Sequence, residues 1–385
     1  MNSKYLRRYL SAAHLYLGLV LGGVFAMLGL TGSFLVFYPE IDRFLNPELQ
    51  ISSRPLSELN VQHMFDRLHE AFPPRQGVWR LELPRDSEQV VYARYLRPEE
   101  KSPELFAPLV VALDPASGTV INSRFWGDYA VTWVYNLHYS LLAGKTGTVC
   151  VSLLGIALCL SVCIGFYLWL PRGANRLKKA IPKVRNNKYQ AIYDLHGYAG
   201  AYGLCMLLVL TVTGIGLATP QWLDPIVNTF PHRAVKLEVE SELPLRTTTR
   251  ISANQAIAVS LAQFPGSQVR WIEAPSTVQG TYVLRLKQNG EPSDRFPKTY
   301  VWVDQFSGKV LDVRDALNVP GADVFFDWMH PLHNGEALGI GGRWLVFILG
   351  LLPFFLWCTG WIRWRHKVKV KRQSESIAQR SWSRH

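Results

Sequence analysis

Apolar residues are concentrated in four stretches of the chain that contain no charged side chain. The stretches are Leu15–Tyr38, Thr146–Leu170, Tyr198–Ala218 and Trp344–Trp361. Each is close to the roughly 20 residues that an α-helix needs to cross the hydrocarbon core of a bilayer. The pattern therefore predicts four transmembrane helices. The mean hydropathy of the whole chain is only +0.05, which indicates that the remainder forms water-exposed structure.

The segments between the first and second stretches, and between the third and fourth, have the pattern of small α+β domains. Residues 57–72 and 252–264 place apolar side chains at helical spacing, and each stretch is stopped by proline. A strand pattern follows each predicted helix, at 78–84 and 269–275. Further predicted strands lie at 90–96, 109–113, 282–286 and 300–303. Each segment then has an Asp-x-x-Ser-Gly turn and a last valine strand, which together predict a helix packed on antiparallel hairpins.

The two halves of the chain repeat the same residues at the same spacing. The first set is His14, Gly18, Thr31 and Gly32, which recur as His196, Gly200, Thr213 and Gly214. The second set is His138, Gly144, Gly147, Gly165 and Trp169, which recur as His333, Gly339, Gly342, Gly360 and Trp364. An internal repeat of this kind indicates duplicated structural units. We predict two parallel copies of span, outer domain and span.

The predicted fold class is a membrane protein with four transmembrane α-helices and two periplasmic α+β domains. The predicted boundaries are 1–38 for the N-terminus and first span, 39–145 for the first outer domain, 146–170 for the second span, 171–197 for a basic loop, 198–218 for the third span, 219–340 for the second outer domain, 341–362 for the fourth span and 363–385 for a basic tail.

Charge predicts the orientation of the chain. Residues 1–13, 171–195 and 363–385 together hold 18 Lys and Arg but only two acidic residues, whereas the whole chain has a net charge of +12. Because loops rich in Lys and Arg remain on the cytoplasmic side, both termini and the middle loop are predicted to be cytoplasmic. We therefore interpret the basic character as a signal of orientation and predict no nucleic-acid partner.

The repeated histidines fall into two layers. His14 and His196 precede outward-going spans, so they are predicted at the cytoplasmic side, and His138 and His333 are predicted at the outer side. Two imidazoles fall short of the four ligands that zinc usually takes. They are sufficient as axial ligands of a haem, because the porphyrin supplies four further nitrogens. A single interfacial histidine is usually an ordinary hydrogen-bonded side chain, but four in register across the repeat predict two haem b groups.

A further histidine and two sets of boundary residues leave alternatives open. His330 lies three residues before His333 and is an alternative ligand, and Pro331 between them predicts that the helix begins there. The aromatic residues near the outer boundary are interpreted as an interfacial belt or as a docking floor; they are Trp126, Tyr129, Trp133, Tyr135, Phe325, Phe326 and Trp328. Several arginines are expected to be solvated surface, with attraction of anionic substrates as the alternative; they are Arg80, Arg94, Arg97, Arg124, Arg270 and Arg285.

Several motifs resemble those of the PepSY-associated transmembrane family. They are Leu137-His138 with Leu141-Leu142-x-Gly144, Trp169-Leu170-Pro171, Asp194-Leu195-His196 with Gly200, Leu332-His333-x-Gly335 with Gly339, Thr359-Gly360, and Phe44-Leu45-Asn46-Pro47. The resemblance covers nearly the whole chain. It implies a bacterial inner-membrane protein, and the best-understood members are ferric-siderophore reductases with two b haems. It also implies haem ligation by His14, His138, His196 and His333, and reduction of a ferric siderophore at the periplasmic face.

The sequence thus predicts a di-haem oxidoreductase in the lipid bilayer. No dinucleotide fingerprint follows a predicted strand and no P-loop is present, so we expect the electron donor to be quinol, a reduced flavin or a separate protein. Three alternatives remain. They are a haem-containing quinol oxidoreductase for another periplasmic acceptor, a non-redox periplasmic binding or regulatory module, and a metal or substrate transporter.

Overall fold

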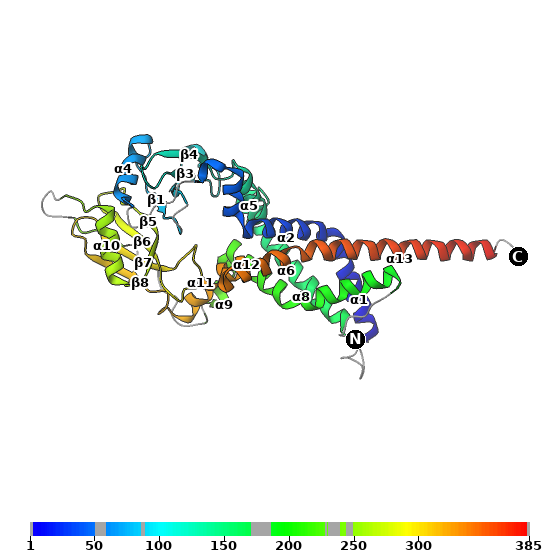
Figure 1. Cartoon of the computed structure of the whole chain (residues 1–385). Helices are drawn as coiled ribbons and strands as arrows, with labels where there is room; N and C mark the ends of the chain where they lie inside the picture. Colours follow the sequence, from blue (N-terminus) through cyan, green and yellow to red (C-terminus); the bar gives the residue numbers. More distant parts are fainter. Residues whose placement is uncertain are drawn as a thin grey trace.

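The computed structural model describes residues 3–50, 59–85, 89–170, 186–227, 229, 239–243 and 249–382. Long helices form a bundle at one end of the molecule, and a β-sheet with two covering helices forms the other end (Figure 1). Both termini lie at the end of the bundle that faces away from the sheet. Most of the predicted basic loop, residues 171–185, and the first two residues of the predicted helix 57–72 lie outside the described residues.

Four helical segments of the described chain are long and apolar enough to cross a membrane. They are Lys4–Val36, Gly144–Trp169, Lys188–Ala218 and Glu336–Ile377. Their elements are α1 (Ser3–Tyr16), the π-helical turn η1 (Leu17–Leu21), α2 (Gly22–Val36), α6 (Gly144–Trp169), α8 (Lys188–Ala218), the short 3₁₀ turn η6 (Glu336–Leu338), α12 (Gly339–Gly350) and α13 (Leu352–Trp382). The third span therefore begins ten residues earlier than the sequence predicts.

The early start of α8 has a local cause. The Asn187 side chain accepts hydrogen bonds from the backbone N–H groups of Tyr189 and Gln190. This cap satisfies donors that the first helical turn otherwise leaves without partners, so the helix forms before the apolar stretch begins. As a result, His196 lies within α8 and not in a loop.

A single antiparallel sheet of eight strands forms the other end of the molecule. The order is β4-β3-β2-β1-β5-β6-β7-β8. The strands are β1 (Trp79–Glu82), β2 (Val91–Tyr95), β3 (Leu109–Leu113), β4 (Val120–Phe125), β5 (Gln268–Glu273), β6 (Thr281–Lys287), β7 (Thr299–Asp304) and β8 (Val310–Arg314). The two halves of the chain meet where β1 pairs with β5, with Leu81 opposite Ile272. The strands predicted for two separate domains therefore belong to one sheet.

One face of the sheet carries the hydrophobic core. The helices α4 (Val61–Ala71) and α10 (Ala253–Gln263) cover this face, and Phe65 and Leu68 of α4 are buried in the same cluster as Leu81, Ile272 and Leu284. The α10 helix begins with a capping box, in which Ser252 and Gln255 bond reciprocally to each other's backbone N–H. Burial of this face fixes the register of the strands and therefore the side on which their polar residues lie.

The opposite face of the sheet is polar and is directed toward the long helices. Three arginines expected to be solvated surface lie on this face with less than a fifth of their side chains exposed, and each is paired with a carboxylate. The pairs are Arg80 with Glu273, Arg94 with Glu82, and Arg124 with Asp42. Arg270, at an edge of the same region, contacts Asp294 and is similarly buried. The expectation of solvated surface was wrong for these four residues. Neighbouring strands supply the carboxylates for Arg80 and Arg94, whereas α3 (Tyr38–Leu45) supplies Asp42 for Arg124 and the loop between β6 and β7 supplies Asp294 for Arg270.

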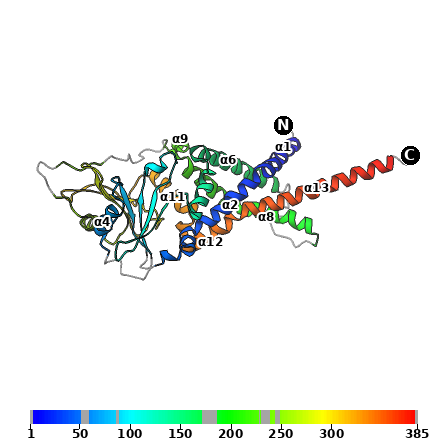
Figure 2. The ribbon, with the colours of Figure 1, turned by 90° about the horizontal axis from the view of Figure 1, so that it is seen from above.

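Two short helices connect the sheet to the bundle. They are α5 (Ala130–Ser140) and α11 (Gly321–Asn334); Figure 2 shows α11 between the strands and the long helices. Pro331 lies inside α11 and does not begin it, which corrects the sequence-based expectation. Proline removes one helical hydrogen bond. The segment stays helical because Ala322, Met329 and Pro331 are buried against their neighbours.

Candidate functional site

The structure brings His14 and His196 together inside the helix bundle. His14 lies in α1 and His196 lies in α8, and the centres of their rings are 6.3 Å apart. The two residues are 182 positions apart in the sequence. They meet because the four long helices pack side by side, with α1 against α6 and α8 against α13.

A second pair forms at the end of the bundle next to the sheet. His138 lies in the last turn of α5 and His333 lies in the last turn of α11. The centres of these rings are 6.2 Å apart. Both helices end immediately afterwards in left-handed backbone, at Leu141 with φ 49° and at Gly335 with φ 84°. The two turns direct the chain into α6 and toward α12, so each histidine is fixed where the path of the chain reverses.

Each of the four imidazoles uses its Nδ1 atom in a hydrogen bond within the bundle. His14 Nδ1 lies 2.9 Å from the carbonyl oxygen of Ser161, and His333 Nδ1 lies 3.0 Å from that of Leu210. Because a carbonyl oxygen only accepts, these Nδ1 atoms carry the proton. Threonine hydroxyl oxygens lie 3.0 Å from Nδ1 of His138 (Thr31), 2.9 Å from Nδ1 of His196 (Thr359) and 3.1 Å from Nδ1 of His333 (Thr213). Each of these hydroxyl groups donates its proton to carbonyl oxygens of its own helix, so it accepts from the imidazole N–H. This arrangement leaves Nε2 with its lone pair free for a metal.

A glycine faces each of the four imidazole rings. A Cβ atom on Gly165 would lie 2.8 Å from Cε1 of His14, and one on Gly32 would lie 3.0 Å from Cε1 of His138. The corresponding distances are 3.0 Å from Gly214 to His333 and 3.4 Å from Gly360 to His196. The missing side chains let the rings lie against the helix backbone. All four glycines belong to the repeated sets of the sequence, but their role opposite the rings becomes visible only in the structure.

The spacing within each pair fits a metal that both imidazoles bind. Two imidazoles on opposite sides of one ion, each with a metal–nitrogen bond of about 2 Å, place their ring centres roughly 6 Å apart. In the described part of the chain, no group of three or more His, Cys, Asp or Glu side chains is arranged to hold a metal. Two neutral imidazoles with fixed tautomers are the axial donor set of a b-type haem. The residues present therefore fit haem better than a bare ion.

The two pairs lie near opposite ends of the bundle. Gly32, which faces His138, comes 18 positions after His14. At 1.5 Å per residue this separation corresponds to about 27 Å along the helix. The hydrocarbon core of a bilayer is about 30 Å thick, so the two pairs have the spacing of two layers near its two boundaries.

The alternative ligand His330 is turned away from the outer pair. Its ring centre lies 4.3 Å from that of Phe296, and its Nδ1 is 3.2 Å from the side-chain nitrogen Nδ2 of Asn334. His330 therefore faces the loop between β6 and β7. His333 is the residue of α11 that meets His138.

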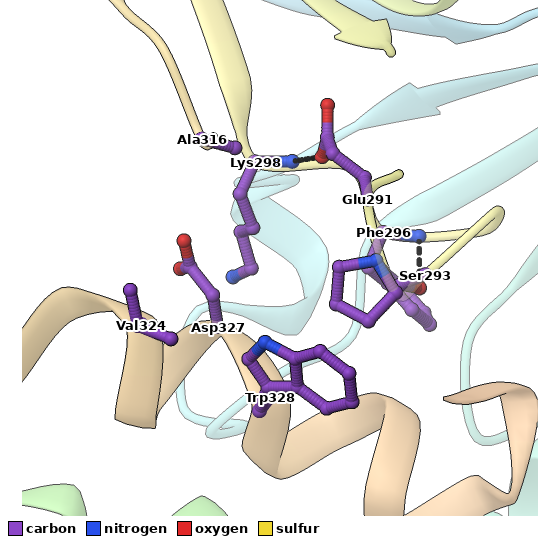
Figure 3. A pocket seen from close by; sticks show the side chains of 9 residues that line it. Glu291, Ser293, Phe296, Lys298, Ala316, Val324, Asp327 and Trp328 are labelled. Atoms are coloured by element: carbon purple, nitrogen blue, oxygen red, sulfur yellow. Dashed lines mark hydrogen bonds between the residues drawn. The ribbon is translucent and has the colours of Figure 1, made fainter. Parts of the chain in front are cut away.

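A small cavity lies beside α11 on the side of the sheet (Figure 3). It is lined by Glu291, Lys298, Asp327 and Trp328, and Lys298 extends toward the Asp327 carboxylate. Its volume is about 20 Å³, which is enough for a water molecule but not for a chelate. Burial lowers the pKa of Lys298 and raises the pKa of Asp327. These residues connect the sheet to α11 and so position His333.

The aromatic residues near this boundary divide into two groups. Trp126 is buried, packs against Tyr135 with ring centres 5.1 Å apart, and donates its indole N–H to Asn136. Tyr129 stacks under Arg124, and burial raises its pKa to about 12. Trp133, Phe325 and Trp328 are exposed. The first group therefore supports α5, and only the second group has the exposure that a belt or a docking floor requires.

Comparison with known proteins identifies the family of this chain. The model of the PepSY-associated TM region matches residues 11–367, which include all four histidines of the two pairs. A relative described as "Uncharacterized protein PA4219" from Pseudomonas aeruginosa is 26% identical over 237 residues, and the match covers 58% of each chain. The present chain thus matches less than two thirds of that relative's length. With four helices of membrane-spanning length and a family match over nearly its whole extent, this multi-pass membrane protein belongs to the family of the PepSY-associated TM region.

Proposed function

We propose that this protein is an inner-membrane di-haem b oxidoreductase. In this proposal it passes electrons from the cytoplasmic side to the periplasmic side and reduces a ferric siderophore there, which releases the iron. The sequence resembles that of the ferrioxamine reductase FoxB, and the basic termini favour a cytoplasmic position for both ends of the chain. We further infer that the two halves arose by duplication and that each contributes a PepSY-like domain to the shared sheet.

The observation that carries the proposal is the paired geometry of the histidines. Both pairs have ring centres about 6 Å apart, and every ring has its Nδ1 bonded within the bundle and a glycine next to its Cε1 atom. The two histidines of each pair would hold a haem, which would supply one-electron redox chemistry at a potential that the protein sets. A purely structural histidine needs neither a fixed Nε2 lone pair nor a glycine opposite its ring.

The residues of the bundle have definable tasks in this function. The carbonyls of Ser161 and Leu210 and the hydroxyl groups of Thr31 and Thr359 hold the imidazoles in one tautomer and one orientation. Hydrogen bonds of this kind increase the basicity of a metal-binding imidazole and so tune the potential of the metal. The apolar helices around both pairs exclude water. A change of net charge at either pair is therefore poorly solvated and costs more free energy than it would in water.

The outer surface indicates where a ferric chelate would be reduced. Among the described residues, the cavity beside α11 is too small for a chelate. A larger groove of about 410 Å³ lies between α4 and α10, but it is on the face of the sheet away from the bundle. We therefore expect reduction at the exposed boundary near Trp133 and Phe325 and not in a buried pocket. Gain of one electron weakens the hold of a hard oxygen chelator, because Fe(II) carries less charge and is softer than Fe(III).

The proposal is tested by the visible spectrum of the purified full chain, oxidised and then reduced with dithionite, together with the amount of haem per chain. We expect about two low-spin haems per chain, and oxidation of the reduced protein when a ferric siderophore is added. A folded preparation from haem-replete cells that contains no haem would refute the redox function. It would favour the outer sheet as a binding module.

A further inference from the structure

Arg295 is a partly buried cation near the helices that carry the outer histidine pair. It lies in the loop between β6 and β7, and its guanidinium carbon is 3.7 Å from the centre of the Tyr38 ring and 5.4 Å from that of Phe296. Its Nε is buried and has no hydrogen-bond partner. Within the described ranges, no carboxylate forms an ion pair with Arg295.

Most other arginines of this region have a carboxylate of their own. Arg314 contacts Asp327 at 2.9 Å, and Arg343 contacts Glu40 at 2.8 Å. Glu336 contributes to the electrostatic environment of Arg295, but its carboxylate accepts a hydrogen bond from Ser293 at 2.6 Å. Burial lowers the pKa of Arg295 to about 9. A partly buried charge that no carboxylate of the described residues contacts is costly, so this position suits an anion that a bound ligand brings.

The position of Arg295 relative to the outer pair indicates which anion this is. Tyr38, which stacks on Arg295, contacts Tyr135, and Tyr135 lies one helical turn before His138 in α5. Phe296 on the other side contacts His330, which lies one helical turn before His333 in α11. Arg295 is therefore connected to both helices that carry the outer pair, to α5 through Tyr38 and to α11 through Phe296.

We propose that Arg295 binds a carboxylate of the ligand held at the outer histidine pair, namely a propionate of the outer haem. This inference rests on the proposed function. Haem b carries two propionate groups on one edge of its ring, and the planar guanidinium presents paired N–H donors that match a carboxylate. The same chemistry would also suit a carboxylate on a substrate, and the experiment below separates the two sources.

The first test is the reduction potential of the outer haem in the purified full-length holoprotein with Arg295→Gln. Loss of a cation beside the haem disfavours the added electron, so we expect the potential to fall. A tenfold shift in the reduction equilibrium, which corresponds to 59 mV for one electron, is the expected minimum. Arg295→Lys keeps the charge but loses the paired donors, so it should give a smaller fall in the potential. It also provides the test if Arg295→Gln does not fold.

Arg285→Gln is the matched control. Arg285 also has a buried Nε without a partner, but it lies between Trp271 and Tyr300, one aromatic layer farther from the pair than Arg295. We expect its loss to shift the outer potential less than half as much as loss of Arg295. Equal shifts would mean that the net charge of the region, and not a direct contact with Arg295, sets the potential of the outer haem. That result would overturn the inference.

The second test identifies the source of the carboxylate. The apoprotein is loaded with haem or with haem dimethyl ester, whose propionates are uncharged. We expect Arg295→Gln to weaken the binding of haem at the outer pair and to leave the binding of the ester unchanged. Equal affinities of wild type and variant for haem, or an unchanged potential combined with a raised KM for a carboxylate-bearing ferric chelate, would overturn the inference and assign Arg295 to the substrate. Wild-type protein without haem would instead refute the proposed function, and this inference with it.

Discussion

Replacement of Gly165 by alanine tests the histidine geometry with a single methyl group. The new Cβ atom would lie 2.8 Å from Cε1 of His14, whereas in Gly360→Ala it would lie 3.4 Å from Cε1 of His196. The two glycines hold the same position in the two repeated sets and face the two histidines of one pair. They therefore form a natural control for each other.

The expected magnitude follows from the two distances. To reach an ordinary contact of 3.4 Å, the His14 ring must move by about 0.6 Å, and overpacking of this kind costs about 1–3 kcal/mol. With 1.4 kcal/mol for each factor of ten, the inner haem should bind about 5- to 150-fold more weakly in Gly165→Ala. Because alanine is the better helix former by about 1 kcal/mol, the helix itself should not be weakened.

The assay is titration of haem into the purified apoprotein of each variant, with circular dichroism as the check on the fold. We expect Gly165→Ala to lose affinity at one of two sites, and we expect Gly360→Ala to behave as the wild type. If both variants bind haem equally, or if Gly360→Ala is the weaker binder, the assignment of these glycines as supports of the imidazole rings is refuted.

Three further predictions concern the ligands and the sheet. His196→Ala should remove one haem and leave the other, because the two pairs lie at opposite ends of the bundle; loss of both without unfolding, seen in the haem content, would contradict two independent layers. His330→Ala should leave the haem content unchanged, whereas His333→Ala should halve it, and the reverse result would exchange their roles. Leu81→Ala, at the completely buried contact with Ile272 between the two halves, should lower the free energy of unfolding by about 2–5 kcal/mol, and an unchanged unfolding midpoint would exclude a stabilising role for this contact.

The parts of the fold with a strong periodic signal could be predicted from the sequence. The four spans, the helix with the Ser252–Gln255 box and most strands lie close to their expected positions, because long apolar runs and caps are local properties. The juxtaposition of His14 with His196 also agrees with the repeat, since equivalent residues of parallel copies meet near a common axis.

Contacts between distant segments could not be read from the sequence in the same way. The pairing of β1 with β5 joins residues about 190 positions apart and leaves no local pattern, so two domains were expected where the strands share one sheet. The helical path through Pro331 depends on the packing of α11 and overrides the local preference of proline. Arg80 and Arg94 show no sign in the sequence of the carboxylates that neutralise them across the strands.

The way the histidines are divided between the halves has a consequence for assembly. Residues 1–170 hold His14 and His138, and residues 186–382 hold His196 and His333. Neither half contains both members of a pair, so a half expressed alone has no complete site. If the proposed function holds, two separately expressed halves should become coloured only when they associate. Pigmentation would then serve as a direct readout of fragment complementation within the membrane.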